Sequence, residues 1–258
     1  MQFSRMIHKK IDKKVDSFLF ITMKLNKSLN PNIYYCFGNK YASLSLVKRK
    51  EVYLMLGNQE ISSKRFVMAE QTHSTQIRVV KDSDIGSGFL ENKGPIPIVD
   101  GFITNKTNVF IVIKGADCTP ILVYSKKQNV IGGCHSGRQG TKNGIIKVLL
   151  TSMTRDYGLN KEDLVVMIGP AISGANYQVS EDIYSDFVEF TGIEQDYRKI
   201  DMQKVILHDV LDLGIQAENI VIKSECTYAS PDYFSYREDK TKERQISIIG
   251  IVHGKIFE

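Results

Sequence analysis

Four short segments rich in β-branched residues follow one another between residues 100 and 136, and turn residues bound each of them. They are DGFITN (100–105), NVFIVIKG (108–115), TPILVYS (119–125) and NVIGGCHS (129–136). Short apolar runs of this composition, closed by Gly, Asn, Asp or Ser, are typical of β-strands. The middle of the chain is therefore expected to form a sheet whose strands are joined by short connections.

The rest of the chain adds further strands and then helices. Similar runs predict strands within residues 17–25, 33–40, 64–82, 163–172, 219–225 and 244–254, whereas residues 83–97 are rich in Gly, Ser and Pro and predict a surface loop. Apolar residues at helical spacing predict helices within 143–158, 180–192 and 201–214, with Ser180 as an N-cap and with Gly158 and Gly192 as ends. This pattern predicts a single α+β domain, with a mixed sheet flanked by helices, spanning residues 17–258. Residues 1–16 are expected to be an N-terminal extension.

Charge and cysteine content narrow the class of protein. The net charge is +5 in 258 residues and is spread along the chain without a basic helix or RNA-binding signature, so nucleic acid is not an expected partner. Four cysteines without a CxxC pair do not form a disulfide framework, and we expect reduced thiols in a cytoplasmic protein. The apolar run near the N-terminus is shorter than a membrane span and lacks a small-residue cleavage site, so neither a membrane protein nor a signal peptide is expected.

Two potential ligands lie at the ends of adjacent predicted strands. If TPILVYS and NVIGGCHS pair as a hairpin, Cys118 opens the first strand and His135 closes the second, at roughly 5–8 Å between Cα atoms. Cys134 alternates with His135 and should face the opposite side, as a core residue. A cysteine in a strand is often only packing, but the glycines around this hairpin would let a backbone approach a ligand closely.

His73 lies in a polar loop after a predicted strand and is a candidate third ligand. Two imidazoles and a thiolate suit zinc, and three protein ligands leave one position for water or substrate. The gaps of 45 and 17 residues from His73 to Cys118 and on to His135 form no local metal motif. Ligand chemistry therefore permits a zinc site here without requiring one.

Six motifs in order resemble those of the YfiH-like proteins, a family also known as laccase-domain or polyphenol oxidase proteins. The motifs are QTHS (71–74), VDGFIT (99–104), GADCTPILV (115–123), HSGRQGT (135–141), IGPAISGANYQV (168–179) and CTYASPDYFSYR (226–237) followed by Arg244. The resemblance covers roughly residues 33–253. It implies a YfiH-like fold and a zinc-dependent purine nucleoside enzyme that performs phosphorolysis of adenosine, inosine, guanosine and methylthioadenosine and also deaminates adenosine.

The same resemblance assigns roles to particular residues. It implies that His73, Cys118 and His135 are the metal ligands. Where the family has HAGWRG this chain has HSGRQG, so Arg138 stands in place of Trp and Gln139 in place of Arg. The arginine-bearing stretch that follows an early Gly-Phe in the family is absent, and Gln178 replaces a Glu. These departures imply altered specificity, lower rates or a reliance on Arg138.

Other site candidates combine the resemblance with side-chain chemistry. Asp117 is adjacent to a ligand and is expected either to shuttle protons or to orient a metal-bound histidine and cap its loop. Arg237 and Arg244, with Arg138, are candidates for holding phosphate, because a guanidinium pairs with phosphate in a bidentate manner. The alternative for Arg237 and Arg244 is that they are surface residues beside glutamates.

Three other functions remain open from the residues. A single copper could occupy the trio in a polyphenol oxidase, although five histidines without a His-x-His pair cannot build a four-copper centre. Cys118 could instead be a nucleophile with His135 as its base, in a cysteine hydrolase. The chain could also be a metal-carrying interaction protein without activity. The expected partners are a nucleoside and phosphate, and the chain could be a monomer or a dimer.

Overall fold

The computed structural model describes residues 21–48, 52–56 and 59–253. The predicted N-terminal extension, residues 1–16, lies outside the described residues. The strands are β1 (Ile21–Lys24), β2 (Asn26–Lys27), β3 (Ile33–Phe37), β4 (Val52–Leu56), β5 (Gln59–Glu60), β6 (Phe66–Met68), β7 (Ile77–Val79), β8 (Gly101–Thr104), β9 (Val109–Gly115), β10 (Thr119–Ser125), β11 (Ile131–Ser136), β12 (Leu164–Ile168), β13 (Ile220–Ile222) and β14 (Gln245–Ile251). The helices are α1 (Leu44–Lys48), α2 (Arg138–Lys142), α3 (Ile145–Tyr157), α4 (Glu181–Thr191), α5 (Met202–Asp212) and α6 (Tyr236–Asp239).

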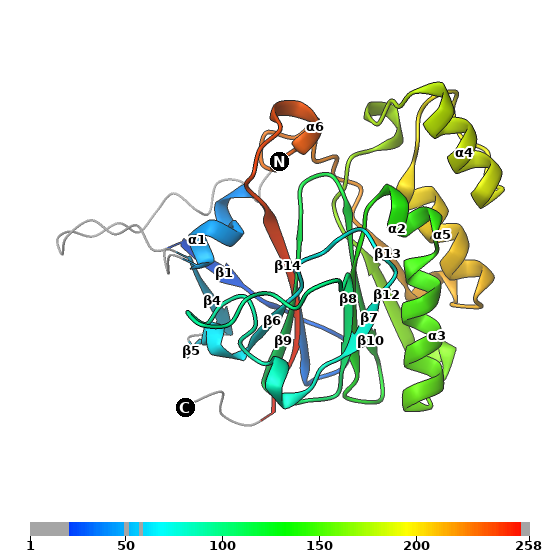
Figure 1. The fold of residues 1–258 in the computed structure, drawn as a ribbon. Helices are drawn as coiled ribbons and strands as arrows, with labels where there is room; N and C mark the ends of the chain where they lie inside the picture. Colours follow the sequence, from blue (N-terminus) through cyan, green and yellow to red (C-terminus); the bar gives the residue numbers. More distant parts are fainter. Residues whose placement is uncertain (1–20, 49–51, 57–58, 254–258) are drawn as a thin grey trace, which may run out of the picture.

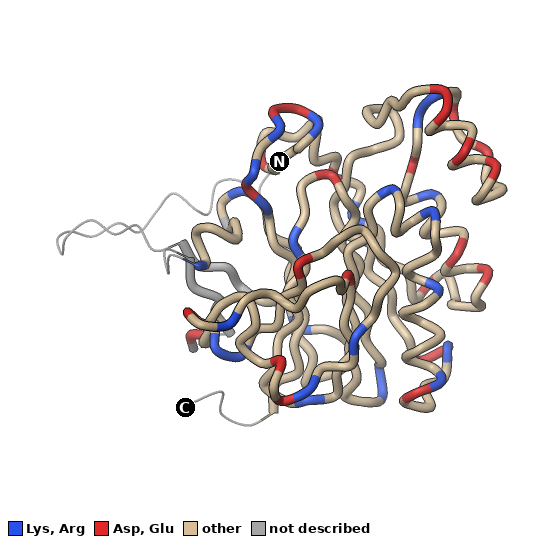
Figure 2. Tube along the Cα trace, viewed as in Figure 1, with Lys and Arg blue, Asp and Glu red and all other residues tan. Residues whose placement is uncertain are grey.

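Two larger sheets and one small sheet organise these strands. A six-stranded sheet has the order β13-β12-β10-β11-β8-β7, a five-stranded sheet has the order β2-β3-β14-β9-β6, and β1, β4 and β5 form a third. Figure 1 shows α3 and α5 side by side along one side of the six-stranded sheet, with the five-stranded sheet on its other side. In the same view, Figure 2 shows that charged residues lie mainly on helices and connecting loops. Parallel and antiparallel pairs occur in both larger sheets. The predicted α+β domain with mixed sheets and flanking helices is therefore confirmed.

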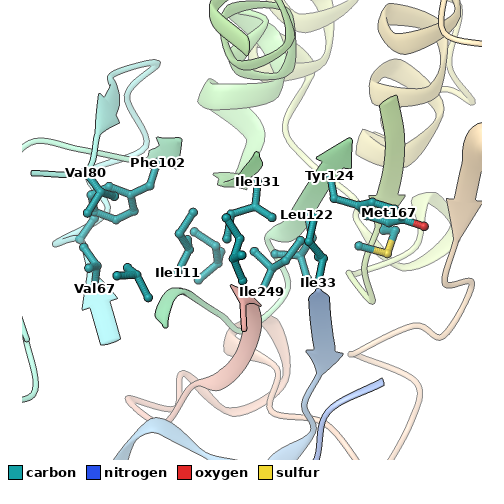
Figure 3. Packing of buried hydrophobic residues seen from close by; sticks show 14 of the residues in the cluster. Ile33, Val67, Val80, Phe102, Ile111, Leu122, Tyr124, Ile131, Met167 and Ile249 are labelled. Atoms are coloured by element: carbon teal, nitrogen blue, oxygen red, sulfur yellow. The ribbon is translucent and has the colours of Figure 1, made fainter. Parts of the chain in front are cut away.

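Strand β10 shows why this arrangement forms, because both of its faces are covered. All seven of its residues are buried, as expected for a strand with layers on both sides. Leu122 and Tyr124 point into a core between the two large sheets, which Figure 3 shows from close by, whereas Ile121 and Val123 pack toward α3. Burying each large apolar side chain of this kind contributes about 1.5–3 kcal/mol.

The predicted hairpin is present and places the site. Strands β10 and β11 pair in antiparallel fashion, with Pro120 opposite His135 and Thr119 opposite Ser136. Cys134 faces the helices, in the cluster that contains Ile121 and Val123, as strand alternation predicts. Cys118 and His135 consequently share the face that looks toward the second sheet, at one end of the inter-sheet core.

The three longer helices lie where the sequence predicts them, with one difference in capping. Helix α3 begins after Gly144 and ends at Gly158, both in the left-handed region. Ser180 occupies the N-cap position of α4, but its side chain makes no capping hydrogen bond, whereas Asp201 caps α5 through the backbone N–H of Lys204. The short helices α1, α2 and α6 are not among the predicted elements. No helix among the described residues is long and apolar enough to cross a membrane.

Candidate functional site

The structure brings His73, Cys118 and His135 together at the end of the inter-sheet core. One potential ligand atom from each lies within 4.8 Å of the other two, and the Cys118 Sγ to His73 Nε2 distance is 3.7 Å. The two imidazole rings meet edge to face, with 4.9 Å between centroids. His135 is buried, Cys118 is half-buried and His73 is exposed, so the trio spans the boundary between core and solvent. This arrangement could hold a metal ion.

Gly137 lets the backbone pass close to two side chains of the trio. A Cβ atom built on Gly137 would lie 2.5 Å from Cδ2 of His73 and 2.9 Å from Cys118 Sγ, both inside van der Waals contact. Any larger residue would push these side chains away, so Gly137 allows the backbone to pass directly against them. Two imidazoles and a thiolate suit zinc and also suit copper, so the donor set fits either metal.

Asp100 is the residue that holds two of the three potential ligands in place. Its side chain is fully buried, and Oδ1 accepts hydrogen bonds from the backbone N–H of His73 at 3.0 Å and from Nδ1 of His135 at 3.0 Å. The other oxygen, Oδ2, accepts the backbone N–H groups of Thr72 and Ser74 at 3.0 and 2.7 Å, together with both hydroxyl groups. His73 has a φ of 64°, which is unfavourable for a residue with a side chain. The three consecutive N–H bonds to Asp100 offset that cost.

The same contacts set the protonation of the trio. Burial would raise the pKa of Asp100, but hydrogen bonds from His135 and Ser74 hold it well below its usual range, so the carboxylate is charged. An ionised Asp100 keeps the proton of His135 on Nδ1 and leaves Nε2 to face Cys118. Such a carboxylate–histidine pair is the usual support of a metal-binding imidazole.

Without a metal, the thiol and the imidazole behave as an ion pair. Burial would raise the pKa of Cys118, but the charge of His135 and the hydrogen bonds from His135 and His73 lower it to about 6. Burial would lower the pKa of His135, but the Cys118 thiolate and Asp100 raise it to about 9. At neutral pH the free site is therefore a thiolate beside an imidazolium, and the thiolate is ready to bind a cation.

A cavity of about 850 Å³ opens over the trio. Its lining contains every site residue expected from the sequence: His73, Asp117, Cys118, His135, Arg138, Arg237 and Arg244. Lys114 and Lys240 bring its cationic side chains to five, against the carboxylates of Glu70 and Asp117. Within the described part of the chain, none of these five cations forms an ion pair with a carboxylate. The cavity therefore favours an anionic ligand.

Asp117 faces this cavity, but both of its oxygens are already engaged. Oδ1 accepts the hydroxyl of Thr227 at 2.8 Å, and Oδ2 accepts the backbone N–H of Arg237 at 2.7 Å. Its φ of 84° is strained for a non-glycine residue. Asp117 thus joins the loop before β10 to the segment that carries Arg237, which is the geometry of an orienting residue.

The arginines of the cavity are held by carbonyl groups and aromatic rings. Arg237 donates from Nη1 to the carbonyl of Gln178 at 2.7 Å and lies 4.9 Å from the Tyr177 ring centroid. Arg244 donates to the carbonyl groups of Thr241 and Glu243 and lies 6.0 Å from the Tyr236 ring centroid. These contacts fix each guanidinium while its charge stays available to the cavity.

Sequence reasoning missed three residues that shape the site. Asp100 lies in VDGFIT and Gln71 in QTHS, so both were inside recognised motifs without an assigned role. The Gln71 side chain exchanges two hydrogen bonds with the backbone of Lys114, at 2.7 and 2.9 Å, and so joins the His73 loop to β9. Lys114 donates hydrogen bonds to the carbonyl groups of Ala69 and Glu70. It lies outside the six sequence motifs, so no motif pointed to it.

Among the described residues, Cys36, Cys226, His208 and His253 do not line the cavity of the trio. All four cysteines are free thiols, and burial raises the pKa of Cys36 to about 12. Cys226 is half-buried and accepts backbone and side-chain N–H groups from Ser173 and Asn176. His208 lies on an exposed face of α5, and His253 follows β14.

Comparisons with known proteins place the chain among relatives. A family model described as "Multi-copper polyphenol oxidoreductase laccase" matches residues 47–252. The chain is 30% identical over 242 residues to a Bacillus subtilis protein named purine nucleoside phosphorylase YlmD, covering 90% of this chain and 84% of that one. It is also 30% identical over 221 residues to a purine nucleoside phosphorylase of Bacteroides thetaiotaomicron, with coverage of 82% and 78%.

Solved structures agree with this placement. The hypothetical protein YfiH of Bacillus licheniformis superposes with a TM-score of 0.72 at 26% identity, covering 85% of this chain and 92% of that one. YlmD from Geobacillus stearothermophilus gives a TM-score of 0.69 at 26% identity, with coverage of 75% and 76%. The matched residues include the metal-compatible trio and the cavity around it. The chain therefore belongs to the YfiH-like, laccase-domain family.

Proposed function

We propose that this chain is a zinc-dependent purine nucleoside phosphorylase. The observation that carries the proposal is that one cavity joins a His-Cys-His trio to five cationic side chains. The names of the relatives from Bacillus subtilis and Bacteroides thetaiotaomicron support the same reaction. The proposed substrates are adenosine, inosine, guanosine and methylthioadenosine.

The trio is proposed to be the zinc site, and the chain's own residues prepare it. Asp100 holds the proton of His135 on Nδ1, so that Nε2 is directed toward Cys118 and His73. Gly137 keeps the space between His73 and Cys118 open. Zinc supplies a Lewis acid that polarises an oxygen of a bound ligand.

The cationic wall is proposed to hold phosphate for phosphorolysis. In this reaction a phosphate oxygen bonds to ribose C1′ while the bond from C1′ to the purine breaks, and the departing base takes up a proton. Arg237 and Arg244 are already oriented by carbonyl groups, so they lose little freedom when they bind phosphate. Asp117 is proposed to position Arg237 through its backbone N–H.

Adenosine deamination is a second proposed activity of the same site. A set of His and Cys ligands is also used by zinc deaminases, in which water adds to C6 of adenine and ammonia leaves. Since both oxygens of Asp117 accept hydrogen bonds within the protein, we propose that it orients the loop rather than shuttling the proton.

Specific observations weigh against the other functions. A four-copper oxidase needs many more histidines than the five in this chain, and the trio is the one His, Cys, Asp and Glu group of metal-binding geometry among the described residues. The Cys118–His135 ion pair resembles that of cysteine hydrolases, but the convergence of His73 on the same thiolate favours a metal ligand. Because all four cysteines are free, we also propose a reducing, cytoplasmic location.

A product screen tests the proposal. Purified protein is incubated with zinc, phosphate and each nucleoside, and the products are separated by chromatography. We expect free base and ribose 1-phosphate, with inosine as a further product from adenosine. Cys118→Ala should lose at least about 10²-fold in rate, because the Lewis acid is lost or displaced. Cys36→Ala removes a thiol outside the cavity and is the matched control. Equal product traces for wild type and Cys118→Ala would assign the activity to a contaminant.

A further inference from the structure

A second cavity of about 510 Å³ adjoins the one above the trio. Arg138, Tyr177 and Arg237 line both cavities and form the wall between them. Arg138 follows Gly137, whose backbone lies against His73 and Cys118, so the second cavity begins one residue along the chain from the trio. Figure 1 shows α2, which starts at Arg138, next to α4 at the same end of the molecule.

Three arginines converge on the second cavity. Arg138, Arg198 and Arg237 line it, and no carboxylate does. The acidic residues of the first turn of α4 do not line it: Glu181 accepts the Tyr197 hydroxyl, and Asp182 accepts the Ser180 hydroxyl and also interacts with the charge of Arg138. An anion entering this cavity would therefore meet three positive charges, of which Asp182 partly offsets that of Arg138.

Carbonyl groups of one short segment hold two of these arginines in position. Arg198 donates from Nε to the carbonyl of Val179 at 3.0 Å, and Arg237 donates from Nη1 to the carbonyl of Gln178 at 2.7 Å. Each guanidinium has five N–H groups, so most of them remain for a ligand. Arginines that are fixed in this way are suited to a planar or tetrahedral anion such as phosphate.

We propose that the second cavity binds the phosphate group of a phosphorylated purine nucleoside whose base and ribose lie in the first cavity. This inference rests on the proposed function, because it takes the first cavity as the nucleoside site. Both volumes lie within the usual range for small-ligand pockets, so the two together can hold a nucleotide. The phosphate co-substrate would then keep Arg244, Lys114 and Lys240, which line the first cavity alone, and would share Arg237, which lies in the wall between the two cavities.

Arg198 provides a selective test, because it lines the second cavity and not the first. The affinities of zinc-loaded protein for AMP and for adenosine are measured by calorimetry in phosphate-free buffer. We expect AMP to bind about tenfold more tightly than adenosine, and this ratio to fall to about one in Arg198→Ala. Lys199→Ala removes the same charge from the next residue, which lines neither cavity, and should keep the wild-type ratio.

The outcomes separate this inference from the proposed function. Adenosine binding without a preference for AMP, or a preference that survives Arg198→Ala, would overturn the nucleotide site and leave the nucleoside enzyme standing. Inorganic phosphate is the second probe. If phosphate binding depends on Arg198 while AMP has no advantage over adenosine, the cavity belongs to the co-substrate and the inference is wrong. If neither adenosine nor AMP binds, the proposed function fails and the inference fails with it.

Discussion

Replacing Asp100 with Asn should weaken the proposed metal site although Asp100 is not one of its proposed ligands. The amide offers one oxygen in place of two. The least costly orientation keeps the oxygen at the Oδ2 position, where four donors from Thr72 and Ser74 converge. The amide N–H₂ then faces the backbone N–H of His73 and Nδ1 of His135, which both lose their acceptor. The substitution therefore disturbs the two histidines of the trio first.

The magnitude follows from these two lost bonds. A hydrogen bond to a charged acceptor contributes about 1.5–3 kcal/mol. Because His73 is exposed and water can replace part of the loss there, we take the lower end of this range for both bonds, which lowers the free energy of unfolding by about 3 kcal/mol. Because domains of this size are usually stable by about 5–15 kcal/mol, the variant should still fold. Loss of the carboxylate partner of a ligating histidine typically reduces metal affinity about 10–100-fold. Urea unfolding measures the first effect, and competition with a chromogenic chelator measures the zinc affinity.

Asp84→Asn is the matched control for Asp100→Asn. Asp84 is also a buried carboxylate, bound by Arg78 at 2.8 and 2.9 Å and by the backbone N–H of Lys81, and it does not line the cavity. Its substitution should lower stability and leave zinc affinity unchanged. Wild-type zinc affinity in Asp100→Asn, or an equal loss of affinity in both variants, would refute the role assigned to Asp100.

Three further predictions concern the same cavity. Gly137→Ala places a Cβ atom 2.5 Å from Cδ2 of His73 and 2.9 Å from Sγ of Cys118, so zinc affinity should fall at least about tenfold. Chelator competition measures this affinity, and a wild-type value would show that the space left by Gly137 is not needed. Since the pKa of His135 is raised to about 9, its proton must leave when zinc binds, so zinc affinity should rise about tenfold per pH unit between pH 7 and 9. A flat profile in that range would contradict this. Arg237→Ala should raise the KM for phosphate about tenfold and change the deamination rate less, because deamination uses no phosphate. Steady-state kinetics of both reactions measure this. Equal losses in the two reactions would show that Arg237 only supports the fold.

The elements that could be predicted from the sequence are those with a local pattern. Short β-branched runs closed by turn residues mark β8 to β11, and the hairpin register follows from them, so Cys118 and His135 could be placed on one face and Cys134 on the other. Helices α3, α4 and α5 are long enough to show helical spacing. Helices α1, α2 and α6 span five residues or fewer, which is too short for that signal.

The parts that could not be predicted depend on contacts between distant segments. The role of Asp100 depends on Thr72, His73 and Ser74, which lie 26 to 28 residues before it and fold back over its carboxylate. The spacing of the motifs VDGFIT and QTHS does not predict this contact. Gln71 pairs with the backbone of Lys114 across a longer gap of 43 residues. Ligand chemistry made His73 a candidate third ligand, but only the family resemblance assigned it, since its distance along the chain from Cys118 forms no local metal motif.

The central claim is that one zinc ion, held by His73, Cys118 and His135, makes this cavity an active site. Titrating metal-free protein with zinc while following phosphorolysis of a purine nucleoside tests it most directly. The rate should rise linearly and reach its plateau at one zinc per chain, and Cys118→Ala should stay at least about 10²-fold lower at every zinc concentration. Full activity in metal-free protein, or a Cys118→Ala curve that overlays the wild type, would contradict the claim.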